Sequence, residues 1–350
     1  MRPMSVVVVI VLLCFLLPPT SPLSYSPNEA AKISLSSSSS SFSRIQIVPS
    51  RVEFDQVSRR YPWTWQRRLV SSVPYREYAL YNVSFTACSE HVIIKGPSSS
   101  GKSTILKVLA GMETPTNGSV VIQVGSSLAN SICFHHNHAV SSFAPLLPVA
   151  KPVYLDQRRR DFDDRPKQET VESILMKHAE SELRVGLRSV TMEDTTESLG
   201  SLLVSQICRS LALDPAQCVS QLSSSQSYQL QLALASITSM FLGNYCQIST
   251  TEKGSNEHRN EDEQSAAVLC FAAPILLLDE WLDTETSTVI RAVEQTAIQG
   301  VTDLGGVVLT VTHKVERYGL GSSSNILQNQ HFGRCRVLTL NRGEITKNEA

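Results

Sequence analysis

The stretch from Gly96 to Thr104 constrains the fold of this chain more than any other part of its 350 residues. Its letters, GPSSSGKST, fit the pattern G-x-x-x-x-G-K-[ST] in full. An apolar run with strand character, His91–Lys95, precedes it, and Ile105–Met112 follows with helical spacing. A strand, a glycine-containing loop and a helix in this order form a phosphate-binding loop (P-loop). The glycines let backbone N–H groups converge, and the helix start adds the positive end of its dipole.

Each fixed position of this loop has a chemical reason. Lys102 supplies a point charge for the β- and γ-phosphates of a nucleotide, and the Ser103 hydroxyl coordinates Mg²⁺. We therefore predict that the chain binds ATP with Mg²⁺. The predicted nucleotide contacts are Gly96, Pro97, Ser98, Ser99, Ser100, Gly101, Lys102, Ser103 and Thr104.

A P-loop needs a second contact to Mg²⁺ from a neighbouring strand. The buried-strand pattern Pro274–Leu278 ends in two adjacent acids, Asp279 and Glu280. Asp279 is predicted to hold Mg²⁺ through water. Glu280 lies one step further, on the other side of the pleat, where it is placed to polarise the attacking water.

Apolar periodicity places strands at both ends of the chain and helices between them. This arrangement predicts an α/β fold: a P-loop nucleoside triphosphatase core with a mostly parallel sheet, an antiparallel edge sheet and a helical subdomain. Ser126–Val149 is expected to be irregular. The expected strands are Ile45–Phe54, Ala79–Ala87, His91–Lys95, Gly118–Val124, Ile275–Leu278 and Val307–Val311, and the expected helices after the P-loop helix are Glu169–Met176, Leu199–Leu213 and Ser227–Leu242.

The order of the motifs resembles that of the ATP-binding-cassette (ABC) ATPases, over roughly Arg51–Ile345. Val52–Val57, followed by Arg60-Tyr61-Pro62, is similar to the family's first strand and its adenine-stacking aromatic. Tyr61 is therefore the base-stacking candidate. A packing role for Tyr61 stays open, and so does its replacement by Tyr75 or Tyr78.

Three further positions carry the resemblance. Gln157, in YLDQ, stands where the family has its Q-loop, which implies contact with Mg²⁺ and the attacking water. Ser223 belongs to LSSSQ, in the place of the LSGGQ signature, which implies contact with the γ-phosphate held by the opposite subunit. His313 follows the last core strand, Val307–Val311, and resembles the switch histidine that contacts the γ-phosphate. The resemblance implies Gln157, Glu280 and His313 as the catalytic residues.

The chain departs from the family pattern in three ways. Both signature glycines are serines, Ser224 and Ser225, so close backbone approach to a phosphate is impaired. The basic residues usual after the signature are absent, with Tyr228, Gln229 and Leu234 in that stretch. The stretch from Glu280 to the D-loop aspartate, Asp283, is about three residues shorter than usual, so the turn must be rebuilt around Trp281. These departures put the rate of hydrolysis and the symmetry of a dimer in question, but leave ATP binding untouched.

The resemblance implies an ATP hydrolase that binds ATP between two cassettes, in a dimer of like or unlike chains. It also implies a separate membrane subunit that ATP hydrolysis powers for transport. Three alternatives stay open: a non-transport ABC ATPase acting on nucleic acid, a P-loop small-molecule kinase, and a nucleotide-binding regulator without turnover. A net charge of −1 argues against direct nucleic-acid binding.

The N-terminus reads as a leader rather than as part of the fold. Residues 1–24 contain the apolar run Val6–Leu17, too short to span a bilayer and typical of a signal peptide. Residues 25–48 are Ser-rich and poor in acids, and resemble a transit peptide. The two parts together predict a plastid location, with the secretory pathway as the alternative. The ABC ATPase domain is expected over residues 49–346, with a helical subdomain at about 158–240 and a disordered insertion at about 243–266.

Overall fold

The computed structural model describes ten stretches of the chain, and all of them lie in one unit, residues 40–350. Most of the predicted leader, the Tyr61 region, Gln157 and most of the predicted insertion fall outside these stretches. The described residues are 42–60, 77–124, 131–135, 139–140, 151–156, 168–186, 193–241, 246–249, 267–313 and 335–349.

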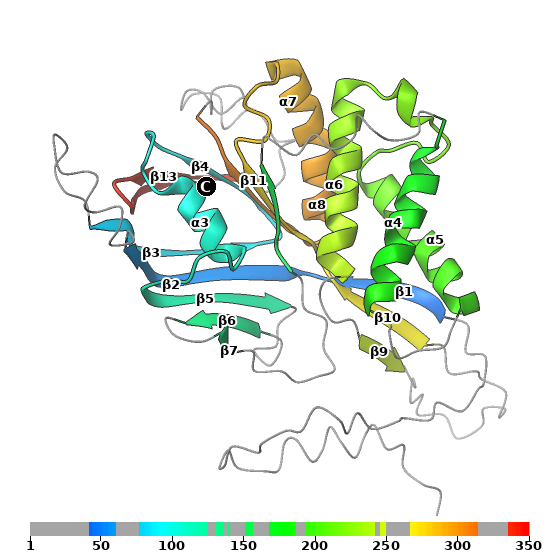
Figure 1. Cartoon of the computed structure of the whole chain (residues 1–350), viewed down its shortest axis with the longest axis horizontal. Coiled ribbons are helices and arrows are strands. Elements are labelled where there is room, and N and C mark those ends of the chain that lie inside the picture. Colours follow the sequence, from blue (N-terminus) through cyan, green and yellow to red (C-terminus); the bar gives the residue numbers. More distant parts are fainter. Residues whose placement is uncertain are drawn as a thin grey trace, which may run out of the picture. The chain divides into compact units, whose positions relative to one another are not determined.

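A six-stranded, mostly parallel sheet forms the centre of this unit (Figure 1). Its strand order is β14-β13-β4-β12-β11-β8, and only β14 runs antiparallel to its neighbour. Because the other strands are parallel, their carboxyl ends meet at one edge of the sheet, where α/β proteins place their ligands. The strands are β4 (His91–Lys95), β8 (Val153–Asp156), β11 (Ile275–Asp279), β12 (Val307–Val311), β13 (Cys335–Asn341) and β14 (Glu344–Glu349).

Two other sheets accompany the central one. An antiparallel sheet has the order β3-β2-β5-β6-β7, and a three-stranded sheet has the order β1-β10-β9. Their strands are β1 (Phe42–Val48), β2 (Ser50–Arg60), β3 (Tyr78–Cys88), β5 (Asn117–Val124), β6 (Ser131–His135), β7 (Ala139–Val140), β9 (Cys246–Ser249) and β10 (Ala267–Ala272).

The helices belong to two groups. The P-loop helix α3 (Lys102–Leu109) lies between the central and antiparallel sheets, whereas the larger group lies on the other face of the central sheet. None of the helices in the described part of the chain is long and apolar enough to cross a membrane. The larger group comprises α4 (Val171–Gly186), α5 (Glu193–Ser210), α6 (Ser224–Phe241), and the consecutive α7 (Ser287–Val293), π-helical η3 (Glu294–Ile298) and α8 (Gln299–Asp303).

Side chains of the central strands point alternately to the two faces of the sheet and so contribute to two separate hydrophobic cores. On β4, Ile93 faces the helical group, while Val92 and Ile94 face α3 and the antiparallel sheet. On β11, Leu276 and Leu278 face the helical group. Ile275 and Leu277 face α3 and the antiparallel sheet. Successive strand side chains point to opposite faces, so a strand that is apolar throughout serves two cores at once.

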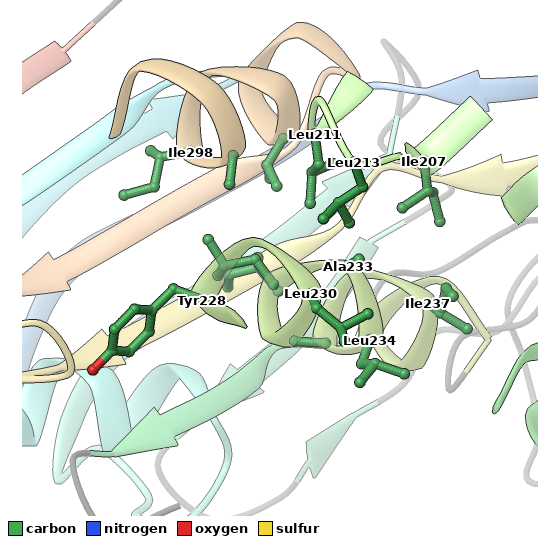
Figure 2. Packing of buried hydrophobic residues seen from close by; sticks show 14 of the residues in the cluster. Ile207, Leu211, Leu213, Tyr228, Leu230, Ala233, Leu234, Ile237 and Ile298 are labelled. Atoms are coloured by element: carbon green, nitrogen blue, oxygen red, sulfur yellow. The ribbon is translucent and has the colours of Figure 1, made fainter. Parts of the chain in front are cut away.

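Helix α6 supplies the centre of the larger core (Figure 2). Leu230, Ala233, Leu234 and Ile237 are buried along it, all below a tenth exposed. They pack with residues from α5 and from the turn after it, including Leu211. The uncharged sequence of α6 matches this position, because the helix is covered on several sides.

The structure confirms the α/β class and corrects three local expectations. The single strand expected at Ile45–Phe54 is two strands, Phe42–Val48 and Ser50–Arg60, and the first begins inside the expected Ser-rich segment and pairs in parallel with β10. Ser131–His135 and Ala139–Val140 extend the antiparallel sheet inside the stretch expected to be irregular. Cys246–Ser249, within the expected disordered insertion, is a strand paired with β10.

A buried polar cluster lies where β4, β13 and η3 meet. It comprises His91, Glu294 and Cys335, of which His91 and Glu294 are both 4% exposed. Burial lowers the pKa of His91 to about 3 and raises the pKa of Glu294 to about 8. It also raises the pKa of the Cys335 thiol to about 12, so near neutral pH burial favours the uncharged form of each group.

Candidate nucleotide-binding site

Two glycines in positive-φ conformations shape the loop between β4 and α3. Gly96 has φ 153° and Gly101 has φ 102°. A Cβ on Gly96 would lie 2.0 Å from the Leu340 carbonyl oxygen, and one on Gly101 would lie 2.3 Å from the Ala79 carbonyl oxygen. Both contacts are impossible for a real Cβ, so only glycine permits the loop to pass this close to β13 and β3.

The lysine of the loop is folded back over it. Lys102 Nζ donates hydrogen bonds to the carbonyl oxygens of Gly96, at 2.9 Å, and Pro97, at 3.0 Å. Burial lowers the pKa of Lys102, while the nearby carboxylates of Glu280, Asp279 and Asp283 oppose that shift. The ammonium group is thus held over the loop, in the position from which a P-loop lysine reaches phosphate oxygens.

The predicted Mg²⁺ ligands come together at the carboxyl edge of the sheet. Ser103 Oγ donates to Asp279 Oδ1 at 2.9 Å, and the Tyr154 hydroxyl donates to the other Asp279 oxygen. A hydroxyl and a carboxylate side by side are hard oxygen donors of the kind that Mg²⁺ prefers, so the residues present fit this ion. Burial, and then the hydrogen bond to Asp279, raises the pKa of Tyr154.

Glu280 and His313 face each other across the ends of β11 and β12. His313 Nε2 lies 2.8 Å from Glu280 Oε1, and both side chains are more than a third exposed. Glu280 adopts a left-handed conformation, with φ 52°, and its N–H donates to the Val311 carbonyl oxygen at 2.9 Å. This turn aims the carboxylate toward His313, at the edge of the sheet where β4 leads into the P-loop.

Asp283 fixes the backbone that carries His313. Its carboxylate accepts from Thr312 Oγ1 at 2.6 Å and from the His313 N–H at 3.1 Å, and the residue is only 7% exposed. The sequence indicated Asp283 only as the D-loop aspartate. The structure shows that it also holds Thr312 and the backbone of His313 in its own chain.

The shortened turn is built around Trp281, as expected. Trp281 is 4% exposed and packs edge-to-face on Tyr228 of α6, with ring centroids 4.8 Å apart. The Tyr228 hydroxyl donates to Glu285 Oε1 at 2.6 Å. Tyr228, in the stretch where the family has basic residues, therefore anchors the turn that contains Trp281 and Glu285 against helix α6.

Ser223 caps helix α6. Its Oγ accepts from the Gln226 N–H at 3.3 Å, and Gln226 Oε1 accepts from the Ser223 N–H at 2.9 Å, which is a capping box. Ser224 and Ser225 lie in the first helical turn and are not among the positive-φ residues. Their backbone therefore has no need of glycine, and the substitutions add side-chain bulk without strain.

Several predicted site residues have no described geometry. Tyr61, Tyr75 and Gln157 lie outside the described residues, although Asp156, directly before Gln157, pairs in register with Asp279. Tyr78 is described, and Arg60 lies over its ring at 5.2 Å from the centroid. A pocket of about 390 Å³ is lined by Ser58, Arg60, Tyr78, Tyr81, Thr116 and Asn117.

Sequence reasoning missed Tyr154 and the positioning role of Asp283. Tyr154 stands in the YLDQ segment singled out for Gln157. Sequence analysis could not say which way the Tyr154 side chain points, because strand β8 was not among the expected strands. The parallel pairing of Leu277 with Tyr154 is the information that places its hydroxyl beside Asp279.

A family model and a relative match parts of this chain. A family model described as "ABC transporter" matches residues 80–240. The sulfate/thiosulfate import ATP-binding protein CysA of Brucella melitensis is 54% identical over 43 residues, which cover 12% of this chain and 12% of that protein. This chain therefore matches only a small part of that relative's length.

Solved structures with partial likeness include two ABC proteins. One is a dimeric ATP-binding cassette in a post-hydrolysis state with ADP and phosphate, 17% identical, with a TM-score of 0.43 over 85% of this chain and 97% of that one. The other is cbiO1 from Clostridium perfringens, part of the ABC transporter complex cbiONQ. It is 13% identical, with a TM-score of 0.48 over 85% of this chain and 87% of that one.

A P-loop, a strand-end Asp-Glu pair and a histidine after the neighbouring strand, on a mostly parallel sheet, define a P-loop ATPase domain. The family model described as "ABC transporter" matches residues 80–240, so this part of the chain is similar to that family.

Proposed function

We propose that this chain hydrolyses ATP at an interface between two cassettes and thereby powers a separate membrane subunit for transport. The observation that carries the proposal is the convergence of Lys102, Ser103, Asp279, Glu280 and His313 at one edge of the central sheet. The family model, and the relative named as an import ATP-binding protein, support the transport part.

The triphosphate would be held by the P-loop. The first backbone N–H groups of α3 have no partner within their own helix, and they point toward the loop with the positive end of the helix dipole. Lys102 would exchange its bonds to Gly96 and Pro97 for phosphate oxygens. Ser103 and Asp279 would hold Mg²⁺, which supplies charge neutralisation on the phosphates.

Glu280 and His313 would then handle the attacking water. A carboxylate is a suitable general base when it lies within hydrogen-bond reach of the water, and Glu280 is solvent-accessible at the sheet edge. His313, 2.8 Å away, restrains the carboxylate and presents its imidazole on the same side. Asp283 keeps His313 in place through the backbone.

The position of Ser223 supports a site shared between two cassettes. Ser223 caps α6, whose residues belong to the core on the helical side of the central sheet. Helix α3, which follows the P-loop, packs into the core on the opposite side. Ser223 therefore belongs to a different layer from its own P-loop, and a second cassette is the natural source of the phosphate that it contacts.

The hydrolysis test uses the variants Glu280→Gln and Lys102→Ala. A control variant, Lys107→Ala, lies on the same helix as Lys102. We expect slow turnover in the wild type and a loss of at least about a hundredfold in Glu280→Gln, because a positioned base contributes about 10²–10⁴-fold. Glu280→Gln should still bind ATP, whereas Lys102→Ala should lose binding. Lys107→Ala, on α3 but away from the loop, should retain both.

Equal turnover in the wild type and Glu280→Gln would refute the catalytic assignment. Unaltered ATP affinity in Lys102→Ala would refute the nucleotide site itself. Rapid transfer of phosphate to a small acceptor would instead favour a kinase. For the partner, we expect co-purification from native membranes to recover a membrane protein with several spans, and recovery of nucleic acid instead would contradict transport.

A further inference from the structure

A second cluster of chemistry-bearing side chains lies at the opposite end of β4 from the P-loop. His91 is the first residue of β4, Cys335 is the first residue of β13, and the two are paired in the parallel ladder. Glu294 reaches the same point from the start of the π-helical turn η3. Three elements from distant parts of the chain thus bring a nitrogen, a sulfur and an oxygen together.

In this cluster the distance from His91 to Glu294 is too long for a direct hydrogen bond, whereas His91 and Cys335 are within reach of a weak hydrogen bond to sulfur. His91 Nδ1 lies 3.7 Å from Glu294 Oε1 and 3.9 Å from Cys335 Sγ, and all three ligand atoms lie within 4.8 Å of one another. A nitrogen and an oxygen that share a proton are normally about 2.7–3.2 Å apart. Around a tetrahedral Zn²⁺, ordinary bond lengths place N and O about 3.3 Å apart, and N and S about 3.6 Å apart.

Glu294 gives an independent sign of a ligand. Its Oε2 atom is buried and has no hydrogen-bond partner among the described residues, although the residue is only 4% exposed. An unsatisfied buried carboxyl oxygen is costly, and an ion is one of the few partners that removes the cost. The π-helical turn that begins at Glu294 is of the kind that often marks functional sites.

The surroundings of His91 have the arrangement of a metal-ligating histidine. Its other ring nitrogen, Nε2, lies 2.9 Å from Thr310 Oγ1 on the neighbouring strand β12. Such an outer contact fixes the orientation of the imidazole and leaves Nδ1 directed at Glu294 and Cys335.

We propose that His91, Glu294 and Cys335 form a metal site that takes one divalent cation, with Zn²⁺ as the best match. Imidazole, thiolate and carboxylate are all Zn²⁺ ligands, and this mixed set is too soft for Mg²⁺ or Ca²⁺. Bound through a thiolate and a carboxylate, a doubly charged ion is neutralised inside the protein.

The ion would tie the base of the P-loop strand to the helical layer. His91 and Cys335 belong to adjacent strands of the central sheet, whereas Glu294 follows α7. The ion would therefore stabilise the fold rather than take part in catalysis. The site is independent of the nucleotide site, and its test does not depend on ATP turnover.

The test uses the full chain, stripped with a chelator and titrated with Co²⁺ in the absence of nucleotide. We expect one Co²⁺ per chain, with a thiolate-to-cobalt charge-transfer band that Zn²⁺ abolishes on displacing Co²⁺. Co²⁺ at the Ser103–Asp279 site would give no such band, because that site has no sulfur. Zn²⁺ analysis of the protein before stripping should also give one ion per chain.

Three variants localise the site. Cys335→Ser should lose the charge-transfer band, and Glu294→Gln should weaken Co²⁺ binding at least tenfold, whereas Cys88→Ser, which changes an exposed free cysteine, should behave as wild type. Circular dichroism and ATP binding report whether each variant folds. If Cys335→Ser does not fold, the wild-type band and Glu294→Gln still decide. A folded wild type without the band, or an unchanged band in Cys335→Ser, would overturn the site.

Discussion

Removing the Asp283 carboxylate tests how the shortened turn holds the switch histidine. This side chain is 93% buried, and its two oxygens accept from Thr312 Oγ1 and the His313 N–H. Asp283→Ala takes away both acceptors. Asp283→Asn keeps the shape and can still make two bonds, because the Thr312 hydroxyl can accept from the new amide while the amide oxygen accepts from His313.

The expected costs follow from these two bonds. A hydrogen bond to a charged group contributes about 1.5–3 kcal/mol, so the loss of two in Asp283→Ala should lower the free energy of unfolding by roughly 4 kcal/mol. Asp283→Asn replaces charge-assisted bonds by neutral ones of about half the strength, and should cost about 1–2 kcal/mol. Asp303→Asn is the control, because Asp303 is an exposed carboxylate bonded to Gln299, and its change should stay within about 0.5 kcal/mol.

Urea denaturation of the three variants measures these differences, and steady-state ATPase assays measure their effect on turnover. For the folded Asp283→Asn protein we expect a lower kcat with little change in ATP affinity, since Asp283 positions His313 and does not belong to the P-loop. The reasoning is refuted if Asp283→Ala is no less stable than Asp303→Asn. It is also refuted if Asp283→Asn reduces ATP affinity while kcat stays the same.

Two further changes test the contacts of α6. Ser223→Ala removes the N-cap acceptor for Gln226 and should cost about 1 kcal/mol of stability by urea denaturation; an unchanged midpoint would mean that the capping box contributes nothing. Tyr228→Phe removes the hydrogen bond to Glu285 while keeping the ring against Trp281, and should cost about 1–2 kcal/mol; a loss as large as that of Tyr228→Ala would show that the hydroxyl dominates over ring packing.

The P-loop, strands β11 and β12, and helices α5 and α6 were predictable from sequence because each has a strong local signal. The loop from Gly96 needs glycine at two positive-φ positions, and the pattern of letters records that need directly. The strand Val307–Val311 is apolar at most positions and occurs with the same bounds in the structure. Such a strand is buried on both faces, so its apolar run can be recognised as a strand without knowledge of its neighbours.

Other elements were not predictable because their signal comes from partners distant in sequence. Strand β8 has only partly buried residues, and it forms by pairing with β11 more than a hundred residues later. The strand expected from Ile45 to Phe54 is divided in two in the structure, because Phe42–Val48 pairs with β10 whereas Ser50–Arg60 pairs with β3 and β5. The same limit applies to the site. Motif order singled out Glu280 and His313, but neither their contact nor the bonds of Asp283 could be predicted, because both depend on how the turn after β11 folds.

The shortened turn works because consecutive residues face different parts of the protein. Glu280, in its left-handed conformation, faces His313, while Trp281 is anchored against Tyr228 on the helix that Ser223 caps. Asp283 turns back to the His313 backbone. A longer loop could reach the same contacts only by ordering more residues, at a cost of about 1–2 kcal/mol of backbone entropy for each. The buried indole of Trp281 anchors this short turn by packing, so that the carboxylates of Glu280 and Asp283 both reach His313.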